Sequence, residues 1–391
     1  MHLLDASHTS HTRAQTGIQR VTRALFAALQ AAGPTTGIGY DPYQRAWREL
    51  DADELDHLRP GQTATGSRGA KWPLRKRLVG HTRRLLRHKP ALPAATALVV
   101  PELFSPKVGA ALPEIFSHVN GPCVAVFHDA IGLKLPELTP AGTVTRLPGY
   151  LRELLTFDGI AAVSEDSAAS LRDYWRWLGV TDAPPVHALP LGLETLSILL
   201  VDNPPTLPAR PRVLCVGTLE GRKNHLALLD ACETLWREGV DFELQLVGLA
   251  RPDTAGAALA KIATLQAAGR PLIYDGAATD HALDAAYARC AFTVYPSMIE
   301  GFGLPVMESL QHGKPCLCSA RGALGESARG GGCVALDSVD ASSIADAVRR
   351  WLRSPAELAA LAAAARARKF RTWTDYAREL TTWMATLPRR H

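Results

Sequence analysis

Short apolar runs alternate along the chain with longer stretches in which apolar residues recur at helical spacing. After residue 17, for example, Leu25, Leu29 and Ala32 would share one face of a helix. Brief apolar runs bounded by turn residues are typical of buried strands, and strands that alternate with helices favour parallel sheets covered on both faces. The pattern therefore predicts a doubly wound α/β protein, with strands at 1–6, 96–100, 123–127, 159–164, 187–193, 212–217, 242–247, 271–274, 291–295, 316–318 and 334–336.

One stretch interrupts this alternation. Residues 201–211 contain four prolines and show no periodicity, which indicates a linker. A chain of 391 residues is also too long to fold around a single hydrophobic core. We expect an N-terminal domain at 1–200, a second domain at 212–372 and a final helix within 373–391, whereas residues 34–95 show no clear pattern.

Composition narrows the class of protein. The chain is 47% hydrophobic and 21% charged, as is usual for soluble globular proteins. No apolar run approaches the roughly 18 residues of a membrane-spanning helix, and Asp5, His8 and Arg13 interrupt any signal peptide. The seven cysteines include no Cys-x-x-Cys motif. We therefore expect a cytoplasmic protein without disulfides or zinc.

The positive charge is concentrated in one block. No acidic residue lies between Asp56 and Glu102, whereas nine lysines and arginines fall between Arg68 and Lys89. Such a block suits an anionic partner, either membrane headgroups, a lipid diphosphate or nucleic acid. It is equally consistent with a solvated basic loop. Nucleic acid is disfavoured as the main partner, because Trp72 is the one aromatic residue in the block.

The richest candidate site is the loop from Pro296 to Leu310, which follows an apolar strand and precedes a helix. Open α/β sheets bind ligands where such strands end, and the free N–H groups of a helix that begins near Leu304 attract anions. Glu300 and Glu308 would add two carboxylates that accept protons from sugar hydroxyls. A nucleotide sugar carries both features. The alternative is an ordinary glycine-rich turn with a solvated Glu308.

Two further candidates follow strand ends. Arg222 and Lys223 lie in the turn after residues 212–217, where two cations would neutralise a diphosphate unless they are simply solvated. His128 directly follows the strand at 123–127. A neutral imidazole there could hydrogen-bond a sugar hydroxyl, although a lone histidine is more often structural.

The last two candidate site residues lie at the starts of predicted helices. Thr16 and Gln19 have the spacing of a capping box around Gly17, so this start is either a second phosphate-facing loop or a capped surface helix. Ser164 begins a run that would cap the next helix, and we weigh this role equally with a contact to the ligand.

The sequence Pro-Ser-x-x-Glu-Gly-Phe-Gly-Leu-Pro, with Glu300 eight residues before Glu308, resembles the donor-site signature of retaining GT-B glycosyltransferases of the GT4 type. Residues 216–224 resemble the phosphate loop of that family, with Thr218 where many members have arginine. The resemblance implies two Rossmann-like domains that face a central cleft, with the final helix crossing back to the first domain.

The resemblance also implies an activity: transfer of a hexose from a nucleotide-diphosphate sugar to a glycan or lipid-linked glycan, with retention and without a metal or another cofactor. GDP-mannose is favoured, since the motifs resemble those of bacterial mannosyl- and rhamnosyltransferases of surface polysaccharides. The catalytic residues would be His128, Arg222, Lys223 and Glu300. The donor-binding residues would be Gly17, Ser164, Gly217, Thr218, Gly301, Phe302, Gly303, Leu304 and Glu308.

Other functions stay open at this point. A sugar-nucleotide epimerase or a phosphorylase could use the same fold, as could a binding protein that performs no chemistry. A Rossmann dehydrogenase is disfavoured, because no Gly-x-Gly-x-x-Gly follows the first strand. Asp51 and Asp53 imitate an Asp-x-Asp metal motif but lie in what we expect to be an exposed helix, so we expect no metal site.

Overall fold

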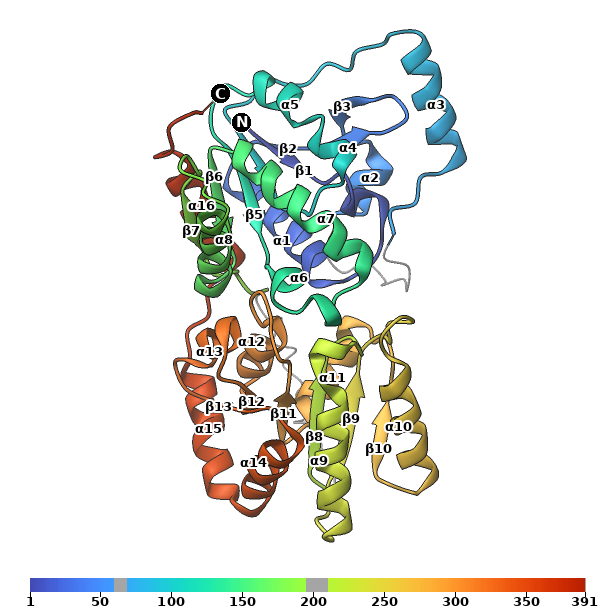
Figure 1. Ribbon diagram of the computed structural model, residues 1–391, viewed down its shortest axis with the longest axis vertical. Coiled ribbons are helices and arrows are strands. Elements are labelled where there is room, and N and C mark those ends of the chain that lie inside the picture. Colours follow the sequence, from blue (N-terminus) through green and yellow to red (C-terminus); the bar gives the residue numbers. More distant parts are fainter. Residues whose placement is uncertain (60–68, 195–209, 391) are drawn as a thin grey trace. The chain divides into compact units, whose positions relative to one another are not determined.

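The computed structural model describes residues 1–59, 69–194 and 210–390, and the chain divides into two compact units (Figure 1). The first unit contains residues 1–130, 142–194 and 371–391, and the second contains 131–141 and 195–370. The final helix thus belongs to the first unit, and the short segment 131–141, which we had expected in the first domain, belongs to the second. Apart from its last two positions, the predicted linker lies outside the described residues.

The first unit is built on a seven-stranded sheet in the order β3-β2-β1-β4-β5-β6-β7. All neighbouring strands are parallel except β3, which pairs antiparallel with β2. The last strand is shorter than predicted and ends at Ala188, because Pro190 has no N–H to continue the ladder. The strands are β1 (His2–Asp5), β2 (Thr35–Asp41), β3 (Ala46–Glu49), β4 (Ala97–Val100), β5 (Cys123–Phe127), β6 (Gly159–Ala162) and β7 (Val186–Ala188).

The sequence pattern failed to predict β2 and β3. Gly37 and Gly39 weaken the apolar alternation of β2, yet packing requires Gly37. A Cβ atom at Gly37 would lie 2.9 Å from Leu50 and 3.3 Å from Phe26. The close approach of these side chains therefore accounts for a glycine in a strand that its own sequence does not favour.

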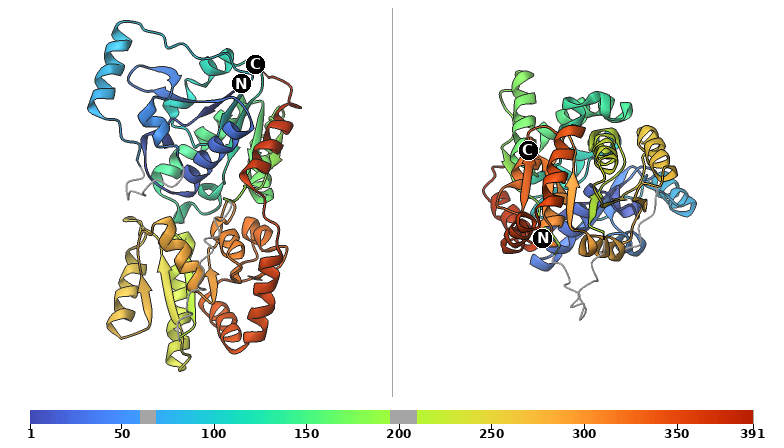
Figure 2. Two further views of the ribbon diagram at one scale, coloured as in Figure 1. Left: turned by 180° about the vertical axis from the view of Figure 1, so that it is seen from behind. Right: turned by 90° about the horizontal axis from the view of Figure 1, so that it is seen from below.

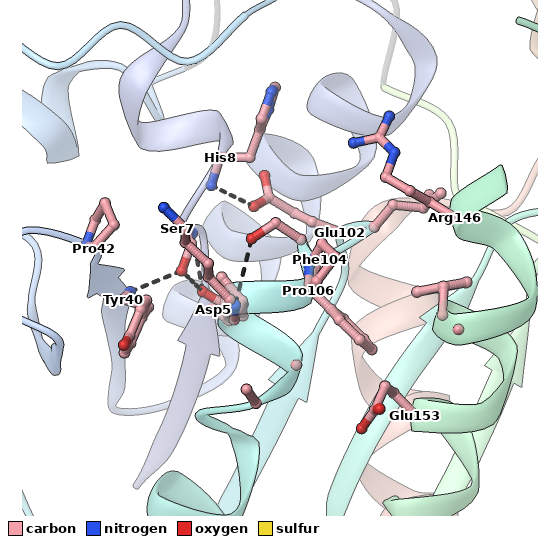
Figure 3. Close-up of a pocket in the computed structure, with 18 of the residues that line it drawn as sticks. Asp5, Ser7, His8, Tyr40, Pro42, Glu102, Phe104, Pro106, Arg146 and Glu153 are labelled. Carbon is pink, nitrogen blue, oxygen red and sulfur yellow. Dashed lines mark hydrogen bonds between the residues drawn. The ribbon is translucent and has the colours of Figure 1, made fainter. Parts of the chain in front are cut away.

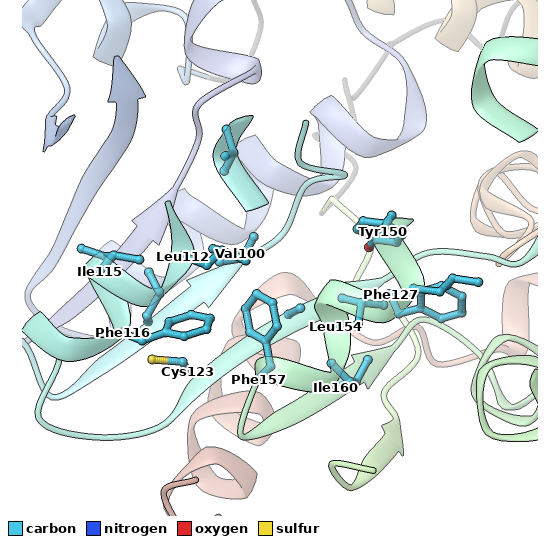
Figure 4. Close-up of a cluster of buried hydrophobic side chains, with 14 of the residues drawn as sticks. Val100, Leu112, Ile115, Phe116, Cys123, Phe127, Tyr150, Leu154, Phe157 and Ile160 are labelled. Carbon is cyan, nitrogen blue, oxygen red and sulfur yellow. The ribbon is translucent and has the colours of Figure 1, made fainter. Parts of the chain in front are cut away.

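Helices cover both faces of this first sheet (Figures 1 and 2). Helix α16 packs against α1, and one face of the sheet buries the apolar cluster around Phe116, Phe127 and Phe157 (Figure 4). The helices of the unit are α1 (Gly17–Ala32), α2 (Ala52–Asp56), α3 (Leu74–Leu85), α4 (Pro106–Gly109), α5 (Leu112–His118), α7 (Ala141–Glu153), α8 (Glu165–Trp177) and α16 (Trp373–Met384).

The second unit contains a six-stranded sheet in the order β10-β9-β8-β11-β12-β13. Every pair in it is parallel, as predicted. The strands are β8 (Arg212–Val216), β9 (Glu243–Val247), β10 (Leu272–Tyr274), β11 (Phe292–Tyr295), β12 (Cys316–Ser319) and β13 (Cys333–Leu336). The helices are α6 (Ile131–Lys134), α9 (His225–Arg237), α10 (Gly256–Ala267), α11 (Asp280–Arg289), α12 (Leu304–Gln311), α13 (Gly322–Ala328), α14 (Ala341–Arg353) and α15 (Pro355–Ala367).

The order of strands places the predicted loop at the middle of this sheet. Strand β8 lies between β9 and β11, so the turns that follow β8 and β11 emerge side by side at the same edge. The apolar core of the unit lies around Phe242, Phe292 and Trp351. Among the helices within the described residues, none combines the length and the apolar character that crossing a bilayer requires.

Candidate functional site

The loop between β11 and α12 depends on a left-handed glycine. Gly303 is the N-cap of α12 with φ at 97°, and a Cβ atom there would lie 3.0 Å from Leu324. The preceding carbonyl of Phe302 accepts a hydrogen bond of 2.7 Å from Ser327 on α13. These contacts hold the loop, including Gly301, at the start of α12, where the first N–H groups of Leu304 and its neighbours can meet an anion.

Glu300 is the centre of a hydrogen-bonded cluster in this loop. Its Oε1 atom lies 2.6 Å from Lys223 Nζ and 2.8 Å from Arg222 Nη1. The same oxygen accepts hydrogen bonds from the hydroxyl groups of Tyr295 and Ser297. Burial alone would raise the pKa of Glu300, but Lys223 and Arg222 outweigh it and lower that pKa to about 2. The carboxylate is therefore ionised throughout the physiological range.

The two cations come from the turn after β8. Residues Gly221–Lys223 form a single 3₁₀ turn, and Asn224 closes it in the left-handed conformation with φ at 58°. Arg222 also pairs with Glu220 at 2.7 Å and donates to the Ile299 carbonyl at 3.1 Å, so it ties the two loops together. The predicted pair is thus largely buried rather than solvated.

The pKa values of the two cations shift in opposite directions, although burial lowers both. Burial lowers the pKa of Lys223, and only part of this effect is compensated by Glu300. The pKa of Arg222 instead rises above its ordinary value, because Glu300 and Glu220 outweigh its burial. Arg251 lies 3.7 Å from Glu220 but pairs more closely with Asp253, at 3.0 Å. Three carboxylates therefore match the three cations, and a diphosphate would compete with these carboxylates for the cations.

Gly217 and Thr218 line the start of this turn. The Gly217 N–H donates to the Val247 carbonyl at 2.8 Å, which extends the pairing of β8 with β9 by one residue. A Cβ atom at Gly217 would lie 3.6 Å from the Tyr295 ring and 3.9 Å from Lys223. The predicted glycine therefore borders the cluster around Glu300, and Thr218 follows it in the turn.

Glu308 has a different neighbourhood. It is buried on α12, and its Oε2 accepts a hydrogen bond of 3.3 Å from Tyr287, whose ring stacks on His312. The alternative of a solvated helix residue is therefore wrong. Glu308 therefore contacts Tyr287, whereas Glu300 contacts Lys223, Arg222 and the hydroxyl groups of Tyr295 and Ser297.

His128 belongs to the first unit, directly after β5. It is buried, and its Nε2 lies 2.7 Å from the Pro101 carbonyl. Because a carbonyl can only accept, Nε2 carries the proton, and Nδ1 of the neutral ring is the acceptor nitrogen. Burial lowers the pKa of His128, which favours the neutral form. This is the protonation state that our hypothesis of a contact with a sugar hydroxyl requires.

Ser164 and Gly17 also lie in the first unit, each at a helix start. The Ser164 hydroxyl accepts the Ser167 N–H at 3.1 Å, so its capping role is confirmed. Gly17 is the first residue of α1, but the predicted capping box is wrong. The Gln19 side chain lies against His8 instead, 3.5 Å from its ring nitrogen, and Thr16 makes no side-chain cap.

A cavity of about 710 Å³ in the first unit was not predicted (Figure 3). Asp5 at the end of β1 and Glu102 after β4 line it, together with Trp72 and Tyr150. Glu102 accepts the N–H groups of His8 and Thr9, both at 2.8 Å. Burial and the charge of Glu102 raise the pKa of Asp5 to about 7. The sequence offered one signal for this cavity, which is that Asp5 and Glu102 lie at or just after the carboxyl ends of strands.

The Asp-x-Asp sequence has a structural role. Asp51 accepts the N–H of Glu54 at 3.1 Å and completes a capping box at the start of α2, while Asp53 lies 3.5 Å from Arg75. Glu54, which we had placed on an exposed helix, is instead buried. Across the described residues, no three His, Cys, Asp or Glu side chains gather into a group suited to a metal ion.

Three residues of the Glu300 cluster escaped prediction: Tyr295, Ser297 and Glu220. Tyr295 ends strand β11 directly before the motif, and Ser297 is the second residue of the motif, but neither had been assigned a role. Glu220 had only its position two residues before Arg222 as a signal. The structure thus brings Arg222, Lys223 and Glu300 together in the second unit, and His128, Ser164 and Gly17 belong to the first.

Comparison with known proteins defines the class. Residues 203–368 match the family model described as glycosyl transferases group 1. The second unit therefore matches a group 1 glycosyltransferase domain, and the predicted GT-B fold is confirmed.

Among curated relatives, the serotype-specific mannosyltransferase WbdA of Escherichia coli is 28% identical over 338 residues, which cover 81% of this chain. The chain spans about 38% of the length of that relative. The O-antigen chain mannosyltransferase B of Escherichia coli is 33% identical over 166 residues, or 41% of this chain and 42% of the relative.

Solved structures share the fold. The sucrose-phosphate synthase of Thermosynechococcus elongatus is 21% identical and has a TM-score of 0.68 over 98% of both chains. The Anabaena protein HepE, solved in complex with UDP and glucose, is 15% identical and has a TM-score of 0.67 over 99% of both chains.

Proposed function

We propose that the chain is a retaining hexosyltransferase that transfers a sugar from a nucleotide-diphosphate donor, with GDP-mannose favoured, to a glycan or lipid-linked glycan. The observation that carries the proposal is the convergence of Arg222, Lys223 and Glu300 beside the N-terminus of α12. Cations, free amides and an ionised carboxylate in one group match the phosphates and hydroxyls of such a donor.

The donor would rearrange this cluster. In the structure, Glu300 Oε1 lies within ion-pair distance of both cations. The diphosphate oxygens would bind Arg222 and Lys223 in place of Glu300. The Glu300 carboxylate could then accept hydrogen bonds from the sugar hydroxyl groups. In the exchange the cations gain phosphate oxygens and the carboxylate gains hydrogen bonds from hydroxyl groups, so the binding of the phosphates and the orientation of the sugar are coupled.

Bond cleavage leaves negative charge on the departing phosphate and positive character on the anomeric carbon. Arg222, Lys223 and the amides at the start of α12 would stabilise the first, doing the work that a divalent ion does in other enzymes. The acceptor hydroxyl would attack the same face of the sugar and give its proton to the departing phosphate oxygen. No protein base is needed, and we expect no metal or other cofactor.

His128 is assigned a positioning contact. Its Nδ1 would accept a hydrogen bond from a donor sugar hydroxyl, since Nε2 is committed to the Pro101 carbonyl. Gly17 would lie over the diphosphate, Ser164 would contact the donor besides its cap, and Glu308 would hold the ribose hydroxyls. The cavity at Asp5 and Glu102 offers carboxyl and aromatic groups to an acceptor glycan.

The preference for mannose rests on the relatives, which are mannosyltransferases by name and of which the chain covers only part. They also support a place in the synthesis of a surface polysaccharide. Such a role requires a cytoplasmic protein, and the basic residues 68–89 would give it peripheral contact with the inner face of the membrane.

Thermal-shift measurements with GDP-, UDP- and dTDP-sugars test the donor. A donor at 100 times its Kd stabilises the folded state by about 2.7 kcal/mol, so the true donor should raise the melting temperature by several degrees. If GDP-mannose has no effect and another nucleotide sugar does, the donor assignment is wrong.

Transfer assays separate the proposal from its rivals. Transfer to glycan acceptors should persist with a chelator, and activity that stops with chelator would overturn the metal-independent mechanism. An epimerase would release a new nucleotide sugar without any acceptor. A binding protein would leave the donor concentration unchanged on long incubation with plausible acceptors.

A further inference from the structure

Helix α3 carries much of the basic block and lies at the outer edge of the first unit (Figures 1 and 2). Its residues are exposed except for Gly80, which is buried, and Lys76, which is partly buried. Yet several of the exposed side chains are large and apolar. Leu74 is 71% exposed, Leu78 59% and Leu85 84%. Adjacent exposed apolar side chains on a soluble unit mark a surface that binds something.

The leucines form one stripe. At about 100° per residue, Leu74, Leu78 and Leu85 fall within roughly 40° of one another around the helix. Lys76 and Gly80 lie on the opposite side, and they are the residues that face the unit. Lys76 pairs with Asp51 at 2.7 Å and Glu54 at 3.0 Å, and a Cβ atom at Gly80 would lie 2.8 Å from Tyr43. The leucine stripe therefore points away from the unit.

Arginines flank the stripe on both sides. On the same helical projection, Arg75 lies on one flank and Arg77 and Arg84 on the other. Arg75 is exposed and lies 3.5 Å from the equally exposed Asp53. The sequence supplies no carboxylate between Asp56 and Glu102, so nothing within the helix opposes these cations.

We propose that α3 lies flat on an anionic lipid surface, with the leucine stripe at the boundary of headgroups and acyl chains. The flanking guanidinium groups would extend outward to lipid phosphates while their alkyl stems stay on the apolar stripe. The combination selects this partner, because a nucleic acid offers no apolar phase for three leucines. The inference rests on the membrane contact proposed above for residues 68–89 and adds the helix face that makes it, and it does not depend on the transfer chemistry.

Vesicle flotation tests the proposal with the full chain. Wild-type protein should float with vesicles of phosphatidylcholine mixed with phosphatidylglycerol and not with phosphatidylcholine alone, and added salt should weaken the binding. The variant Leu74→Ser/Leu78→Ser/Leu85→Ser should bind roughly 100-fold more weakly, since each leucine loses an apolar contact. The variant Arg75→Gln/Arg84→Gln should bind the mixed vesicles roughly 25-fold more weakly, at about 5-fold for each cation removed.

A matched control lies on α8 of the same unit. Trp177 and the adjoining Leu178 are 79% and 51% exposed, so Trp177→Ser/Leu178→Ser removes similar apolar surface elsewhere. This variant should bind the mixed vesicles like wild type. Equal losses in control and α3 variants would overturn the proposal, as would a failure of wild-type protein to float.

Two further readouts identify other outcomes. If light scattering shows an oligomer that the leucine variant dissociates, while wild type does not bind vesicles, the stripe is an interface between copies and the lipid proposal is wrong. The thermal shift caused by nucleotide sugars should be unchanged in every α3 variant. If the protein does not bind vesicles, the proposed donor is therefore unaffected. If it does not bind nucleotide sugars, the proposed lipid-binding face of α3 is unaffected.

Discussion

Each unit holds a glutamate with little exposed side-chain surface between an arginine and a lysine, and the two clusters differ in how the carboxylate is used. In the first unit, Arg48 contacts both oxygens of Glu54 at 2.7 Å, and Lys76 adds a third contact at 3.0 Å. In the second, the contacts recorded for Glu300 within the described chain all fall on Oε1. Both carboxyl groups have a pKa lowered to about 2, although burial would raise it.

Electrostatics alone therefore does not distinguish a binding site from a structural ion pair. Position does. Glu300 lies in a loop after a parallel strand, beside a helix N-terminus, with hydroxyl groups around it. Glu54 lies within α2 and fastens the basic helix α3 to the unit through Lys76. We infer that the Glu54 cluster is built to stay closed, whereas the Glu300 cluster is built to exchange partners with a donor.

The largest expected effect comes from Glu300→Gln. The amide cannot hold the sugar hydroxyls as a carboxylate does, so kcat should fall at least about 100-fold. Affinity for the free nucleoside diphosphate should be unchanged or higher, because Arg222 and Lys223 lose their competing anion. Steady-state kinetics and calorimetric titration with GDP measure the two quantities.

Glu238→Gln is the matched control, since Glu238 is an exposed glutamate of the same unit that pairs with Arg349. It should behave like wild type in both measurements. Full transfer activity in Glu300→Gln would show that the carboxylate has no role in holding the sugar.

The opposite variant, Glu54→Gln, should affect stability rather than chemistry. Breaking the buried ion pair leaves Arg48 with only Asp41, and Lys76 with only Asp51, as a carboxylate partner. The change should lower the free energy of unfolding by about 3 kcal/mol, the low end for a broken buried pair. Urea unfolding measures this loss, with the exposed Glu49 changed to glutamine as the control. Activity per folded molecule should stay close to wild type, and a large loss would remove the distinction between the clusters.

The sequence predicted the second unit better than the first, for a physical reason. The central strands β8, β11 and β12 are largely buried on both faces and appear as short, mainly apolar runs. Strand β2 carries glycines that make room for Leu50 and Phe26, which come from other segments. Local pattern therefore could not identify β2, because the cause of its composition lies elsewhere in the chain.

The candidate site shows the same division. Arg222, Lys223 and Glu300 were predicted from the ends of strands and from a motif, since the topology of parallel sheets brings those ends to one edge, whereas Glu220 was missed. Side-chain partners depend on packing and were missed, as the hydroxyl groups of Tyr295 and Ser297 show. The capping box predicted at Thr16 does not form for the same reason, because the Gln19 side chain packs against His8.

Acid should weaken the Glu54 cluster in a defined window. The pKa of Glu54 is about 2 in the folded protein against an ordinary value of 4.5, so its contribution is complete above pH 4.5 and is lost as the pH falls towards 2. Between pH 7 and pH 3.5, wild type should lose about 1.4 kcal/mol relative to Glu54→Gln. Urea unfolding of both proteins across this range measures the difference, and a constant difference would contradict the assigned ion pair.

Asp5 supplies the contrasting case of a buried carboxyl group whose principal charged neighbour, Glu102, is also acidic. Its pKa is raised to about 7, so ionisation costs stability as the pH rises from about 4 to 7. Asp5→Asn should therefore stabilise the protein at pH 8 by on the order of 1 kcal/mol, and by less at pH 5. The gain stays small because the amide keeps only part of the hydrogen bonding from Ser7. Thermal unfolding at the two pH values measures it, and a larger gain at pH 5 would mean that Asp5 is paired like Glu54 after all.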